Sequence, residues 1–104
     1  MERNEKVVFR EKAKRSIRDI AFYIEHQGYP ETTEKFTKKL VHFGNSLANF
    51  PNAYHLCKQK RLAMKQMQCA VFHKNYIFVY KREKTTLVIY NVIHCKTNPL
   101  FYSA

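Results

Sequence analysis

Three residues close to the C-terminal end carry side chains that can move protons or hold a phosphate group: His94, Lys96 and Tyr102. Only His94 has an unperturbed pKa near neutral pH, about 6.5, so it is the candidate general base or acid. Lys96 would hold the charge of a phosphate, and Tyr102 would donate a proton or stack on a base. Cleavage of RNA by its own 2′-hydroxyl needs such a combination. The structural alternative is that His94 ends a strand as a hydrogen-bonding residue and that Tyr102 lies in a short tail.

A second candidate group is purely basic. Lys58, Lys60 and Arg61, with Lys65 nearby, form the densest positive cluster outside the first predicted helix. Such a cluster would bind nucleic acid or the acidic side chains of a protein partner. The alternative is a solvated loop.

The cysteines and histidines do not predict a metal site. Their spacings fit neither the CxxC nor the HxxxH pattern of zinc ligands. With only two glycines, the chain also has no glycine-rich phosphate loop, and we expect no cofactor. Because the cysteines are three in number (Cys57, Cys69 and Cys95), we expect reduced thiols and no disulfide framework.

Two amphipathic helices precede these groups along the chain. After a short apolar strand at residues 6–9, apolar residues recur with helical spacing from Glu11 onward, and Gly28 is a natural stop. Pro30 suits the first turn of a second helix, which we expect to continue to Phe50 and Pro51. The apolar stripes consist of Ala13, Ile17, Ile20, Ala21 and Ile24, then Phe36, Leu40, Phe43, Leu47 and Phe50.

The second half of the chain is typical of strands. Residues 69–72, 76–80 and 85–94 are rich in β-branched and aromatic side chains, with polar breaks at 73–75 and 82–84. The order is therefore β-α-α-β-β-β, an α+β domain in which a helical hairpin packs on a small antiparallel sheet. The other face or one end of the sheet would stay open for a partner.

Composition and charge set the broad class. The 104 residues predict a single domain, 1–104, and the aromatic content of 14% is that of a globular protein. The formal net charge of +11 favours polyanions or an acidic protein as partner. Neither a secretory signal nor an apolar run of roughly 20 residues is apparent, so we expect a cytoplasmic protein without membrane contact.

The ordered set of segments resembles the RelE/ParE superfamily of bacterial toxins over residues 6–99. The helical part, IRDIAFYIEHQGYPETTEKF, is similar to the family's first helix, turn and second helix, and the Phe50-Pro51 pair to the close of that second helix. The last two strands and the end of the chain also match, in the segments NYIFVYK, LVIYNVIH and HCKTNP.

This resemblance implies a toxin of a type II toxin–antitoxin system, which includes plasmid-stabilisation systems. A cognate antitoxin would neutralise it in a hetero-oligomeric complex. RelE-like members are ribosome-dependent mRNA endonucleases, whereas ParE-like members inhibit DNA gyrase. Whether this chain is an enzyme stays open at this point; as one, it would be a metal-independent mRNA endoribonuclease.

The residues that the resemblance assigns to the nuclease are only partly present. Gln68, Ala70 and Ile77 stand where nuclease members carry basic residues, whereas Lys96 and Tyr102 match the C-terminal part of the pattern. The hairpin expected from Glu11 to Phe50 is long, as in ParE-like members. We therefore favour a ParE-like gyrase poison, with the RelE-like nuclease and a non-toxic basic nucleic-acid-binding module as alternatives.

Overall fold

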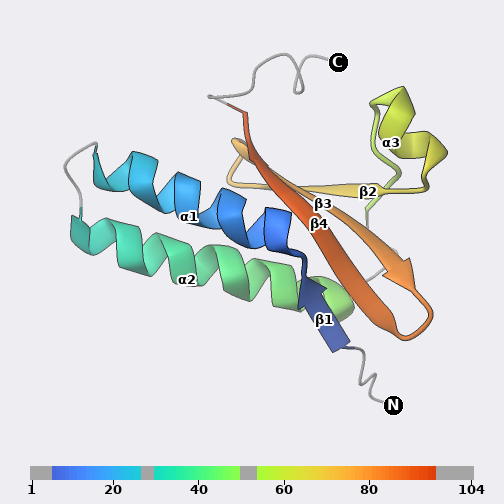
Figure 1. Ribbon diagram of the computed structural model, residues 1–104, viewed down its shortest axis with the longest axis horizontal. Helices are drawn as coiled ribbons and strands as arrows, with labels where there is room; N and C mark the ends of the chain where they lie inside the picture. Colours follow the sequence, from blue (N-terminus) through green and yellow to red (C-terminus); the bar gives the residue numbers. More distant parts are fainter. Residues whose placement is uncertain (1–5, 27–29, 50–53, 96–104) are drawn as a thin grey trace.

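The computed structural model describes residues 6–26, 30–49 and 54–95. The elements run in the predicted order β-α-α-β-β-β, with two additional short helices (Figure 1). They are β1 (Lys6–Phe9), α1 (Glu11–Glu25), α2 (Pro30–Ser46), the 3-10 helix η1 (Leu47–Asn49), α3 (Lys60–Met64), β2 (Gln68–Phe72), β3 (Tyr76–Glu83) and β4 (Thr86–His94).

The four strands form one sheet in the order β1-β4-β3-β2. The α+β class is confirmed, but the sheet is mixed, and the expectation of a purely antiparallel sheet was wrong. β2, β3 and β4 alternate in direction, whereas β1 pairs in parallel with β4, so that Val7 lies opposite Leu87. A parallel neighbour requires a long connection, and here the helical hairpin and the meander together provide it.

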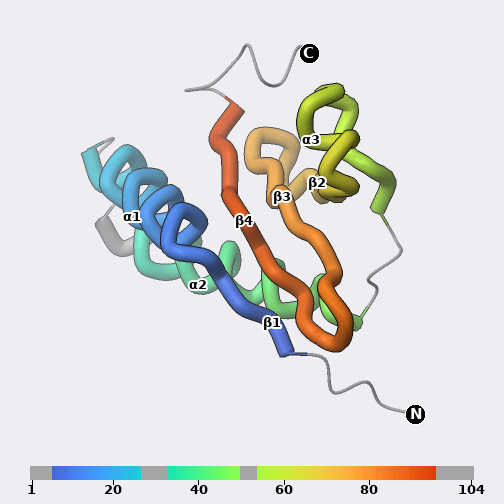
Figure 2. Tube along the Cα trace, turned by 45° about the vertical axis from the view of Figure 1, so that its right-hand side comes forward, coloured from blue at the N-terminus to red at the C-terminus, as the bar shows by residue number. Residues whose placement is uncertain are grey.

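The helical hairpin covers one face of the sheet, with α1 and α2 side by side (Figures 1 and 2). The predicted stripe of α1 is confirmed, since Ala13, Ile17 and Ile20 are buried. α2 ends at Ser46 instead of continuing to Phe50, and its last turn tightens into η1. The Ser46 hydroxyl donates to the carbonyl of Phe43 (2.7 Å). Gly28, Phe50 and Pro51 lie outside the described residues.

The main core lies between the hairpin and the sheet. Phe78, Tyr80, Leu87 and Ile89 have no exposed surface, and one ring from α2 and one from β2 pack against Phe78. The approach of α2 to the sheet is close at Gly44. A Cβ there would lie 2.6 Å from the Phe9 ring and 2.9 Å from the end of Ile89, so glycine fits because it has no side chain.

The loops of the meander differ in part from the prediction. The turn at residues 73–75 is confirmed, and His73 and Lys74 take positive φ angles of 53° and 64°. The predicted break at residues 82–84 was wrong, because β3 continues through Glu83 and the chain turns at 84–85. Arg82 and Glu83 pair with Leu87 and Thr86 in the sheet ladder, which overrides their polar character.

The second face of the sheet, which was expected to stay open for a partner as an alternative to one end of the sheet, is partly covered. The segment from Cys57 to Met67, which we call the α3 arm, packs on Ile77, Val79 and Ile93 through Cys57, Leu62 and Met67. Part of the basic stretch, for which a solvated loop was the alternative to a binding cluster, forms the short helix α3.

The expectation of reduced thiols was also wrong for two of the three cysteines. Cys57 and Cys69 form a disulfide, with their Cα atoms 4.9 Å apart, while Cys95 is a buried free thiol. The isolated bridge between Leu56 and Gln68 brings the two chain segments together at this point. Such a pairing depends on the tertiary fold and leaves no trace in cysteine spacing.

Candidate functional site

His94 lies at the end of β4 and is only 6% exposed. Its ring stacks on Tyr76, with ring centroids 4.7 Å apart and planes at 14°. The ring of Tyr23, from α1, meets it edge-on at 5.1 Å. The strand therefore holds His94 between two aromatic side chains, as a structural residue would be held.

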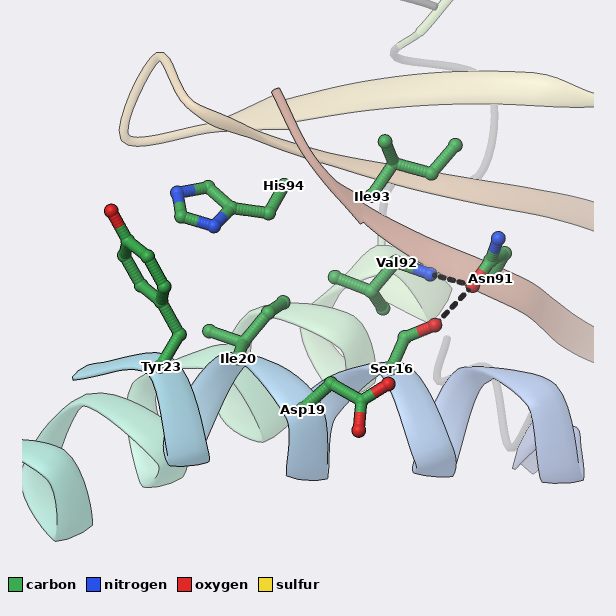
Figure 3. Close-up of a pocket in the computed structure, with 8 residues that line it drawn as sticks. All are labelled: Ser16, Asp19, Ile20, Tyr23, Asn91, Val92, Ile93 and His94. Carbon is green, nitrogen blue, oxygen red and sulfur yellow. Dashed lines mark hydrogen bonds between the residues drawn. The ribbon is translucent and has the colours of Figure 1, made fainter. Parts of the chain in front are cut away.

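A pocket of about 390 Å³ opens beside this ring, and we call it the His94 pocket (Figure 3). Asn91 fixes its wall, because its Oδ1 accepts hydrogen bonds from the Ser16 hydroxyl (2.6 Å) and the Val92 backbone N–H (2.9 Å). One carboxamide thereby ties α1 to β4. The pocket is lined by Ser16, Asp19, Ile20, Tyr23, Asn91, Val92, Ile93 and His94.

The other two candidate catalytic residues, Lys96 and Tyr102, lie outside the described residues. At the positions where nuclease members carry basic side chains, Ala70 and Ile77 are buried. Gln68 donates its side-chain amide to the carbonyl of Tyr54 (2.7 Å). These three positions serve packing and backbone support in this fold.

A second hollow, of about 520 Å³, lies between the start of α1, the α3 arm and β4, and we call it the basic groove. Arg61 and Lys65 line it, and both are exposed. Lys58 and Lys60 are exposed on the same arm but are not among its lining residues. The full lining is Arg10, Glu11, Lys12, Gln59, Arg61, Leu62, Lys65, Met67, Val79, Tyr90, Asn91 and Ile93.

Two further cations of this groove, Arg10 and Lys12, lie outside the basic cluster predicted at residues 58–65. They stand at the junction of β1 and α1, far from Arg61 in the chain, and only the fold brings them opposite the arm. The Arg10 guanidinium lies 5.1 Å from the centre of the Tyr90 ring. That contact holds the positive charge at the rim.

Two polar details distinguish the walls of the basic groove. The Tyr90 hydroxyl donates to the Glu83 carboxylate, and this hydrogen bond raises the pKa of Tyr90, with burial adding to the effect. The Gln59 Oε1 atom is buried and has no hydrogen-bond partner among the residues that the structure describes.

The two hollows are neighbours, because Asn91 and Ile93 line both. The first turn of α1 borders the basic groove, and its later turns border the His94 pocket. Leu62, Met67 and Val79 add apolar surface to the basic groove. The arrangement suits an elongated amphipathic segment that runs along β4 with acidic side chains at the cationic rim.

Within the described ranges, no group of three or more His, Cys, Asp or Glu side chains is placed to hold a metal ion. Nor does any helix in these ranges have the length and apolar character to cross a membrane.

Comparisons with known proteins agree with the fold. The profile of the family described as "ParE toxin of type II toxin-antitoxin system, parDE" matches residues 7–99. A solved structure of the chromosomal ParDE toxin–antitoxin system from P. aeruginosa is similar, with a TM-score of 0.76 and 10% sequence identity. The similarity covers 89% of this chain and 98% of that one. No curated protein matched the sequence.

Proposed function

The chain belongs to the family of ParE toxins of type II toxin–antitoxin systems, and from this premise we propose that it stops bacterial growth by inhibiting DNA gyrase. A cognate antitoxin would neutralise it. The observation that carries the proposal is the family match over residues 7–99, which spans both long helices and all of the sheet except the first residue of β1.

The surroundings of His94 support a mode of action without acid–base catalysis. A general base must reach the proton that it removes. The His94 ring instead packs between Tyr23 and Tyr76 and has little exposed surface. The strand positions that carry basic side chains in nuclease members hold no cation here, since Ala70 and Ile77 are apolar and buried there.

The basic groove is the surface that we assign to the antitoxin. Four cations, Arg10, Lys12, Arg61 and Lys65, border it, against Glu11 as the single acidic lining residue. Its apolar surface, from residues such as Leu62 and Met67, would take the apolar side of an amphipathic segment. The complex would be a hetero-oligomer held by charge complementarity at the rim and apolar contact beneath it.

The RelE-like mRNA endonuclease is the second candidate, and one observation favours it. His94 lines a pocket that also contains Ser16 and Asp19, so polar side chains lie beside the imidazole. A non-toxic nucleic-acid-binding module would share the positive charge, but the membership in a toxin family speaks against it.

Replacing His94 separates the two candidates. We expect His94→Phe to keep the toxicity on induced expression, because phenylalanine preserves a ring between Tyr23 and Tyr76 while removing the titrating group. Loss of a catalytic acid or base would instead lower activity by about 100- to 10,000-fold. The measurement is colony survival after induction.

Two controls keep this experiment decisive. Thermal unfolding of purified His94→Phe establishes that the variant is folded, and His94→Gln tests a polar replacement if the larger ring fails to pack. A folded variant with more than a hundredfold loss of toxicity would contradict the gyrase proposal and favour the nuclease.

A further inference from the structure

The described residues contain one covalent cross-link, the Cys57–Cys69 disulfide, and it closes the loop that carries the basic groove's outer wall. Lys58, Lys60, Arg61 and Lys65 all lie between the two cysteines in the sequence. The cross-link therefore constrains the residues that the sequence singled out as a binding cluster.

Besides the disulfide, the α3 arm is held by a short helix, a few backbone hydrogen bonds and one small apolar cluster. α3 has five residues, far below the roughly 12–15 that an isolated helix needs in water. Two backbone hydrogen bonds close the base of the arm: the Cys57 N–H donates to the Met67 carbonyl (2.9 Å), and the Cys69 N–H donates to the His55 carbonyl (3.2 Å) just outside the arm. Its apolar contacts with the sheet come from Cys57, Leu62 and Met67.

We propose that the Cys57–Cys69 disulfide is a redox modification site, whose reduction by a dithiol loosens the α3 arm and weakens binding of an acidic partner in the basic groove. The loosening follows from the disulfide alone. The effect on binding rests on the proposed function of the groove. Disulfides that occur in reducing compartments are typically transient and redox-sensing, which fits such a site.

The burial of Cys57 and Cys69 determines which of the two sulfur atoms a reductant attacks. Cys57 is 3% exposed whereas Cys69 is partly exposed, so an external thiolate attacks Sγ of Cys69. The Sγ–Sγ bond breaks, and its electron pair leaves with Sγ of Cys57, which takes up a proton. In the mixed disulfide, Sγ of Cys69 is bonded to the first sulfur of the reductant. The second thiol of the reductant then attacks this first sulfur and releases Cys69 as a thiol. The chain gains two electrons and two protons, and the dithiol becomes a disulfide.

Cys95 is a bystander in this scheme. It is buried on the same face of the sheet, and burial raises the pKa of its thiol, which lowers the fraction of reactive thiolate. Cys95→Ser is therefore a matched control for substitutions of the bonded pair.

The test compares the oxidised chain, the chain treated with dithiothreitol, Cys57→Ser/Cys69→Ser and Cys95→Ser by hydrogen exchange of residues 58–67. Closing a loop of this size shifts its opening equilibrium by about 100-fold, so exchange in the arm is expected to accelerate by about that factor on reduction. The double variant should exchange fast in both conditions, and Cys95→Ser should follow the unmodified chain. Equal exchange in the oxidised and reduced chains would overturn the proposal.

Binding of a labelled poly-glutamate peptide then tests the coupling to the groove. We expect the affinity for this peptide to fall about tenfold when the unmodified chain is reduced. The affinity of the double variant should not change on reduction, because its α3 arm is already loosened. Equal affinity before and after reduction would refute the coupling. A peptide that fails to bind even the oxidised chain would contradict the proposed groove, and hydrogen exchange would still decide the redox site.

Discussion

Reversing the charge of Arg61 and Lys65 together is expected to weaken the complex with the cognate antitoxin by about 100-fold. Both side chains are exposed at the rim of the basic groove. An exposed ion pair is worth up to about 1 kcal/mol, and each reversal replaces an attraction with a repulsion of similar size. The two reversals together remove two attractions and add two repulsions, which amounts to about 3 kcal/mol. This free energy corresponds to an increase of about two orders of magnitude in the dissociation constant.

Isothermal titration of purified toxin variants with the antitoxin measures this effect. Lys35→Glu/Lys39→Glu is a matched control, since it makes the same charge change at exposed positions of α2 that do not line the basic groove. The difference in antitoxin affinity between the two variants should become smaller at high salt, because salt screens the charges at the rim of the groove. Equal weakening by both pairs would mean that net charge, and not the groove, determines binding.

The largest expected gain in stability comes from Tyr80→Phe. Tyr80 is fully buried in β3, and its hydroxyl has no hydrogen-bond partner within the described parts of the chain. A buried polar group without a partner costs about 1–3 kcal/mol. We therefore expect the free energy of unfolding of the variant to exceed that of the unmodified chain by about 1 kcal/mol or more at pH 7. Urea denaturation measures this difference.

The same residue predicts how stability depends on alkaline pH. Burial, followed by the nearby Tyr54, raises the pKa of Tyr80 to about 12. The unfolded chain ionises with a pKa near 10, whereas the folded chain keeps the phenol neutral, so stability is intact below pH 10 and falls between pH 10 and about 12. Tyr80→Phe should lose less stability in this window. A variant that is less stable than the unmodified chain at pH 7 would show that the hydroxyl has a partner.

Most of the fold could be predicted because the sequence patterns are local. The helical spacing of Ala13, Ile17 and Ile20 defined the buried face of α1, and runs of β-branched and aromatic residues defined β2 to β4. The parallel pairing of β1 with β4 was not predictable in this way, because it depends on how the hairpin packs.

The candidate site was predicted less completely, since its parts come from distant segments. The sequence singled out Arg61 and Lys65 as neighbours in the chain, but it gave no indication that Arg10 and Lys12 would lie on the opposite rim. It also gave no sign that Cys57 and Cys69 would be bonded. His94 was identified, yet its packing against Tyr23 and Tyr76 is visible only in the folded chain.

A supercoiling reaction shows whether the chain inhibits DNA gyrase. Purified chain is added to DNA gyrase, ATP and relaxed plasmid, with antitoxin-bound chain as the matched control. The same preparation is added to translating ribosomes. We expect the free chain to block supercoiling and to leave ribosome-bound mRNA intact. Normal supercoiling together with mRNA cut at ribosome-bound sites would contradict the claim and establish the nuclease.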